Sequence, residues 1–194
     1  MYLDIVDLRA FYAERLGLIA TRLIGEKLRK AWPSVRGERL LGMGYATPYL
    51  AAFAGEAERA IAFMPATQGV VNWPPEGPNM AALVADDALP LPDAVVDRAL
   101  LVHSLEMTEN AQEQLREIWR VLAPGGRVIL VVPNRRGIWA HAEKTPFGCG
   151  RPFSRGQLTA LLRDTLFSPL GWREALAVPP ITRRGWLRTG ATWE

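Results

Sequence analysis

Two glycines at alternate positions, Gly42 and Gly44, end an apolar segment of the chain and are followed by Tyr45. Glycine lets a ligand come close to the backbone, and a helix that begins directly afterwards offers unpaired N–H groups to it. Gly42, Met43, Gly44 and Tyr45 are therefore candidate contacts for a nucleotide-like ligand. A tight turn between a strand and a helix needs the same glycines for its backbone angles, so the pair alone leaves both interpretations open.

Acidic and imidazole side chains follow two further apolar segments. Asp86 and Asp87 come directly after residues 81–85, and His103 ends the next such segment, with Glu106 on the loop behind it. The carboxyl ends of parallel strands meet at one edge of a sheet, where ligands bind. We expect His103 to contact a ligand, an acceptor or its own local backbone. Glu106 can act as a base, orient His103, or lie exposed near a helix start.

The acidic run continues as Asp, Leu-Pro, Asp and Val-Asp up to Asp97, and Leu-x-Pro-Gly-Gly precedes residues 126–132. This pattern resembles the class I S-adenosylmethionine-dependent methyltransferases of the small-molecule type, from about Glu38 to Phe167. The resemblance implies a doubly wound, Rossmann-like α/β sheet with helices on both faces. It also implies S-adenosylmethionine as the cofactor and methyl transfer to a nucleophilic oxygen, nitrogen or carbon as the activity.

In that family, an acidic residue after the third strand accepts a hydrogen bond from the adenine amino group. Either Asp86 or Asp87 matches this residue, and the sequence does not choose between them. The resemblance also implies that residues 42–45, Met64 and His103 contact the cofactor, and that His103 and Glu106 are the candidate catalytic residues.

The chain departs from the family pattern at several positions. Leu40 stands where an acidic residue commonly precedes the first glycine, and no acidic residue ends the second strand. Gln68 or Asn72 can replace the missing ribose ligand, but a neutral hydrogen bond is weaker than a charge-assisted one. The turn after Gly44 also lacks the third glycine of the family.

A long segment, residues 134–153, is rich in aromatic residues, glycine and proline and is expected to cover the acceptor. Its arginines predict a small anionic acceptor, and its aromatic residues an apolar wall, unless it is a packed surface loop with solvated arginines. The residues concerned are Arg135, Arg136, Arg151, Trp139, Phe147 and Phe153. Nothing near Cys149 would activate its thiol, so we expect it to be inert.

Hydrophobic spacing predicts the elements that hold these residues in place. One or two amphipathic helices are expected up to about Ala31, and strands at residues 39–42, 60–64, 81–85, 97–103, 126–132 and 172–178. Helices are expected between most of the strands. Asn110 and Glu113 resemble a capping arrangement, followed by an apolar stripe of Leu115, Ile118, Trp119 and Leu122. Ser154 and Gln157 form a capping box for a further helix.

The length predicts one domain, in four parts: an N-terminal helical segment (1–36), a cofactor-binding core (37–133), a cover segment (134–153), and a C-terminal helix and strand (154–194). No apolar run approaches the roughly eighteen residues that cross a membrane. With a single cysteine and no signal peptide, a cytoplasmic protein without a metal site is expected. A net charge of +3 favours a small-molecule acceptor, although Arg183, Arg184 and Arg188 leave RNA open.

Other functions compete with the enzyme. The missing carboxylates allow a degenerate methyltransferase fold that serves as a binding or regulatory module. A nicotinamide dehydrogenase is disfavoured, because the acidic ribose contact expected about twenty residues after the glycine turn is missing. The C-terminal strand hairpin of the family looks incomplete. The unguarded strand from Met80 to Ala85 can accept a strand from a small partner protein, which would complete or activate the chain.

Overall fold

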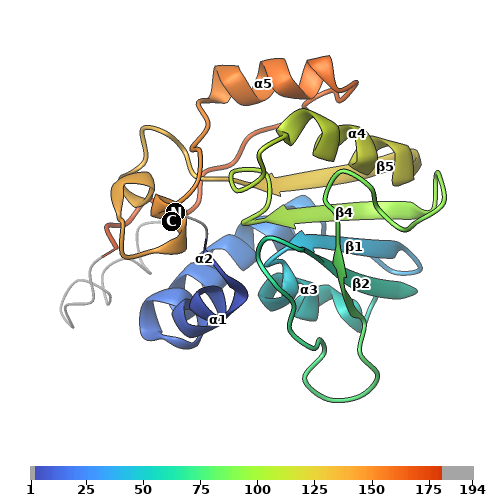
Figure 1. Cartoon of the computed structure of the whole chain (residues 1–194), viewed down its shortest axis with the longest axis horizontal. Helices are drawn as coiled ribbons and strands as arrows, with labels where there is room; N and C mark the ends of the chain where they lie inside the picture. The colour runs from blue at the N-terminus through green and yellow to red at the C-terminus, as the bar shows by residue number, and fades with distance from the viewer. Residues whose placement is uncertain (1–2, 181–194) are drawn as a thin grey trace.

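Five parallel strands form the centre of the computed structural model, which describes residues 3–180 (Figure 1). They are β1 (Arg39–Gly44), β2 (Arg59–Pro65), β3 (Ala81–Val84), β4 (Val96–Val102) and β5 (Leu122–Val131). Their order in the sheet is β3-β2-β1-β4-β5, so the direction of winding reverses between β1 and β4. The predicted α/β sheet is confirmed. Its ligand crevice is expected outside the carboxyl ends of β1 and β4.

Helices cover both faces of the sheet (Figure 1). One face packs against α1 (Ile5–Ala13), α2 (Arg15–Ala31) and α3 (Thr47–Ala54), and the other against α4 (Ala111–Val121) and α5 (Arg155–Asp164). Successive side chains alternate between the two faces: Leu40 belongs to the first core and Leu41 to the second. Two short 3-10 helices, η1 (Ile138–His141) and η2 (Pro146–Gly148), lie in the cover segment.

The helix starts follow the sequence signals. The Asn110 side chain accepts a hydrogen bond from the Glu113 backbone at the start of α4, and Ser154 and Gln157 form a complete capping box on α5. Both predictions are confirmed. Asp4 caps α1 in the same way, because its carboxylate accepts from the backbone N–H groups of Val6 and Asp7.

Residues 172–178 do not form the predicted strand. Leu176 has a left-handed backbone, with φ at +60°, which interrupts extended pairing. Its side chain packs into the core on the α1 face, and the Trp139 indole donates to the Val178 carbonyl at 2.7 Å. The segment is therefore bound to the cover segment, and β5 is an edge strand within residues 3–180.

Two smaller expectations are also wrong. Trp119 does not belong to the buried stripe of α4 and is 50% exposed, because Gln114, Leu115, Ile118 and Val121 form the packed face. No helix separates β2 from β3 or β3 from β4, where residues 66–80 and 85–95 are turns and irregular segments. Within the described part of the chain, no helix is long and apolar enough to cross a membrane. Arg183, Arg184 and Arg188 lie outside it.

Candidate functional site

The glycine turn brings β1 into tight contact with its neighbours. Gly44 has φ at +74°, and a Cβ atom there would overlap the Val102 carbonyl oxygen and lie 2.9 Å from that of His103. A Cβ atom on Gly42 would overlap the Leu50 side chain of α3. Close packing of the strand therefore requires both glycines, whether or not they also approach a ligand.

His103 and Glu106 lie together at the carboxyl end of β4. The Nδ1 atom of His103 is 3.2 Å from Oε1 of Glu106, and each side chain is only 1% exposed. On the other side of the imidazole, Nε2 lies 2.8 Å from the hydroxyl of Tyr12, which is 3.1 Å from that of Tyr49. The two residues that sequence spacing identified are thus joined to two tyrosines from α1 and α3.

The chemistry of these groups fixes the direction of their hydrogen bonds when Glu106 is ionised. A carboxylate only accepts, so Nδ1 of His103 carries the proton and donates to Glu106. When the imidazole is neutral, Nε2 has a lone pair, which accepts from the Tyr12 hydroxyl. In this tautomer the basic nitrogen of His103 points toward α1.

Aromatic side chains cover this imidazole. The ring centroid of Phe147, from η2, lies 4.8 Å from that of His103, and Tyr12 packs against Tyr45 at 5.2 Å. Burial is the largest cause that raises the pKa values of Tyr12, Tyr49 and Tyr45 above their usual range. The tyrosines are therefore neutral at physiological pH, so the Tyr12 hydroxyl retains a proton that it can donate to a neutral His103.

Three buried oxygens at this edge have no hydrogen-bond donor within residues 3–180: Oε1 of Gln68, Oε2 of Glu106 and Oε1 of Gln114. A buried acceptor without a partner costs about 1–3 kcal/mol. S-adenosylmethionine carries the groups that these oxygens lack, namely ribose hydroxyls, an ammonium group and an adenine amino group. The polar residues at the edge therefore fit this cofactor in their donor and acceptor chemistry.

The structure separates the two candidate aspartates. Oδ2 of Asp86 lies 3.4 Å from the amide nitrogen of Gln114, which also donates to the Ser104 hydroxyl at 2.9 Å. Asp86 thus faces the end of β4, whereas Asp87 is exposed. Met64 is fully buried, and its sulfur accepts from the backbone N–H of Val71.

The two candidates for the ribose contact also differ. Gln68 is buried, and its amide group donates to the backbone carbonyl of His103, which leaves its own oxygen without a partner. Asn72 is exposed. Of the two, only Gln68 is therefore joined to the cluster around His103.

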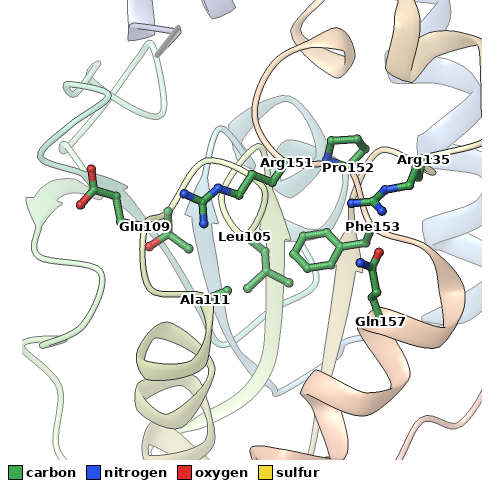
Figure 2. Close-up of a pocket in the computed structure, with 9 residues that line it drawn as sticks. Leu105, Glu109, Ala111, Arg135, Arg151, Pro152, Phe153 and Gln157 are labelled. Carbon is green, nitrogen blue, oxygen red and sulfur yellow. The ribbon is translucent and has the colours of Figure 1, made fainter.

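The cover segment divides between two environments. Trp139 and Phe147 are buried and pack against each other at 5.4 Å, on the α1 side of the sheet. Arg135, Arg151 and Phe153 instead line a pocket of about 210 Å³ beside the loop that follows β4 (Figure 2). Arg136 does not line it. The predicted apolar wall is thus two separate surfaces.

Sequence reasoning missed several residues of the site. Tyr12 lies on an apolar stripe of α1, where its spacing indicates only packing. Ser104 and Gln114 belong to no motif. Burial raises the pKa of the Cys149 thiol, which agrees with an inert cysteine. Among the described residues, no group of three or more His, Cys, Asp or Glu side chains could hold a metal ion.

Known proteins share this architecture. A family model described as a methyltransferase domain matches residues 41–130. A SAM-dependent methyltransferase from Thermotoga maritima superposes with a TM-score of 0.60 at 19% identity, over 83% of this chain and 76% of its own. A SAM-dependent methyltransferase from Archaeoglobus fulgidus gives 0.59 at 18%, over 75% of this chain and 68% of its own.

A third similar structure is a methyltransferase in complex with the Haloferax volcanii Trm112 methyltransferase activator. Its TM-score is 0.59 at 20% identity, over 85% of this chain and 77% of that chain. A comparison with curated proteins finds no match. At these identities the solved structures establish a shared fold, while the family match runs from β1 to β5 and includes Asp86, His103 and Glu106. The chain therefore contains a match to a methyltransferase domain over residues 41–130, on a fold shared with SAM-dependent methyltransferases, which implies S-adenosylmethionine as the cofactor.

Proposed function

We propose that the chain transfers a methyl group to a small anionic acceptor, with His103 as the base that takes the acceptor's proton. The observation that carries this proposal is the buried His103–Glu106 pair at the carboxyl end of β4. A second observation supports the proposal: three buried side-chain oxygens near this pair have no hydrogen-bond donor within residues 3–180. Asp86 holds the adenine amino group, because it faces Gln114 and Ser104 at the same edge, and Asp87 has no such role.

The cofactor supplies a methyl group that its sulfonium already activates for in-line displacement. The protein therefore positions the acceptor and removes a proton where the nucleophile must lose one. Nε2 of His103 takes this proton, and Glu106 stabilises the imidazolium that results. Tyr12 lies at Nε2, where the proton of the acceptor would arrive, so this proposal requires α1 to shift before the acceptor binds.

The anionic character of the acceptor rests on Arg135 and Arg151. Both line the pocket next to Leu105, which directly precedes Glu106 in the chain. Arginine pairs well with carboxylate and phosphate oxygens. Arg136 is exposed and does not line this pocket, so we leave it out of the acceptor site.

The proposal is tested with cofactor labelled at the methyl carbon and a panel of small organic acids that carry hydroxyl, amine or phenol groups. We expect label transfer by the unmodified chain and a loss of about 10²–10⁴-fold in kcat for His103→Gln. Glu106→Gln should lower kcat less, because it removes only the carboxylate that stabilises the imidazolium. Glu113→Gln, on the exposed face of α4, serves as the control. An undiminished kcat in His103→Gln would exclude His103 as the base.

We further propose that a small partner protein adds a strand to the chain along the edge from Met80 to Ala85. β3 is an edge strand, and Leu83 on it is 50% exposed. An open apolar edge invites pairing with another chain. The similar methyltransferase from the activator complex gives this proposal its second support.

Affinity capture from the source organism with the unmodified chain, Leu83→Lys and Leu18→Lys tests this edge. Leu18 is similarly exposed on α2 and provides a matched control. We expect a small protein to be retained by the unmodified chain and by Leu18→Lys, and lost with Leu83→Lys. A chain that stays monomeric and captures no strand-adding protein contradicts the proposal.

A further inference from the structure

The pocket beside the loop after β4 has apolar walls and a cation on each of two sides. Leu105 and Ala111 contribute from the β4 side, and Pro152 and Phe153 from the cover segment. In Figure 2 the guanidinium groups of Arg135 and Arg151 lie on opposite sides of the Phe153 ring. The full lining comprises Leu105, Thr108, Glu109, Ala111, Arg135, Arg151, Pro152, Phe153 and Gln157.

Charge in the pocket favours an anion. Neither Arg135 nor Arg151 pairs with a carboxylate of residues 3–180, in contrast to Arg120, which contacts Asp93 and Glu117. The single carboxylate in the lining, that of Glu109, points away from Phe153 in Figure 2. An anion in this pocket therefore lies between two guanidinium groups, above an apolar floor.

The size of the pocket limits the rest of the ligand. Its volume of about 210 Å³ is below the roughly 300–1,000 Å³ of sites for drug-sized molecules. A single ring or a short hydrocarbon chain fits this space. Because apolar side chains form most of the wall, the body of the ligand must be apolar.

The pocket is also tied to the methyl-transfer centre. The backbone N–H of Arg151 donates to the Glu106 carbonyl at 2.8 Å, and a Cβ atom on Gly150 would overlap that same carbonyl oxygen. Leu105 lines the pocket, while Glu106, the next residue, faces His103. One loop thus forms a wall of both sites.

We propose that this pocket binds the carboxylate end of the methyl acceptor, and that the acceptor is a small organic acid with an apolar body. The inference rests on the proposed function for the identity of the ligand as the acceptor. Arg135 and Arg151 attract the carboxylate from opposite sides of the pocket, and Leu105 and Phe153 contact the apolar body.

Binding of benzoate and of uncharged benzamide, followed by NMR without cofactor, tests the pocket separately from methyl transfer. We expect benzoate to bind about fivefold or more tightly than benzamide, since each exposed ion pair contributes up to about fivefold. Arg135→Gln and Arg151→Gln should each weaken benzoate binding about two- to fivefold and leave benzamide unchanged. Arg136→Gln is the matched control and should change neither affinity.

Circular dichroism of each variant establishes that it is folded. Equal affinity for benzoate and benzamide overturns the inference. So does a loss of benzoate affinity in Arg136→Gln as large as the loss in Arg135→Gln. Absence of benzoate binding to a chain that still binds S-adenosylmethionine overturns it as well, and leaves the proposed methyl transfer standing. Arginine-dependent benzoate binding to a chain that does not bind the cofactor supports the pocket and contradicts the proposed function.

Discussion

The hydroxyl of Tyr12 lies 2.8 Å from Nε2 of His103, although 91 residues separate them in the chain. This contact joins the N-terminal helix α1 to the carboxyl end of β4. That end of the strand lies within the residues that match the family model, close to the buried oxygens that lack a hydrogen-bond donor. The contact also supplies a hydrogen-bond partner to the buried imidazole. The helix is therefore part of the site and not only a cover for the sheet.

Tyr12→Phe tests the contribution of this contact to stability. The variant leaves Nε2 of His103 buried without a hydrogen-bond partner, which should lower the free energy of unfolding by about 1–3 kcal/mol. Tyr45→Phe is the matched control, because the Tyr45 hydroxyl has no hydrogen bond within residues 3–180 and should change stability by less than about 0.5 kcal/mol. Urea unfolding measures both. Equal losses in the two variants would mean that the bond to His103 contributes nothing.

Alkaline pH should destabilise the fold through the same tyrosines. Burial raises the pKa of Tyr12 and of Tyr49 above the ordinary value of 10.0, so the unfolded chain releases these protons first. Stability is then full below about pH 10 and falls as pH rises further, by about 1.4 kcal/mol per pH unit for each tyrosine. Urea unfolding on either side of pH 10 measures the slope. Tyr49→Phe removes one of the two titrating hydroxyls and should lower the slope by about 1.4 kcal/mol per pH unit. An unchanged slope would show that folding does not raise the pKa of Tyr49.

Alanine substitutions at Gly44 and Gly37 distinguish the cost of backbone strain from the cost of steric overlap. Both have positive φ, +74° and +72°, but a Cβ atom on Gly37 meets no atom within 4 Å. Gly37→Ala should cost about 1–2 kcal/mol from its backbone conformation alone. Gly44→Ala should cost at least about 2 kcal/mol more, because its methyl group would overlap the Val102 carbonyl of β4. Thermal unfolding compares the two, and equal costs would place the strand ends farther apart than described.

Local signals in the sequence predicted the elements well. The strands β1, β2, β4 and β5 each contain a short apolar run, and the caps at Asn110 and Ser154 satisfy backbone N–H groups that any helix start leaves unpaired. His103 and Glu106 are three residues apart, so one loop brings them together. For these strands and helix caps, the signals lie in neighbouring residues of the chain, and the predictions are confirmed.

Features that depend on distant contacts could not be predicted in this way. Tyr12 has the spacing of a core residue, and nothing near it in the sequence indicates His103. Residues 172–178 have the composition of a strand, yet the Trp139 indole binds the Val178 carbonyl and Leu176 turns into the core. Tertiary packing overrode local propensity in both cases.

Calorimetric titration with S-adenosylmethionine tests the central claim, that the cofactor binds at the carboxyl edge of the sheet and that Asp86 holds its adenine. We expect saturable binding by the unmodified chain. Asp86→Asn should bind about tenfold more weakly, because it loses a charge-assisted hydrogen bond, and Asp87→Asn should bind as the unmodified chain does. A folded chain that shows neither heat nor a thermal shift at millimolar cofactor, or equal affinities in both variants, would contradict the claim.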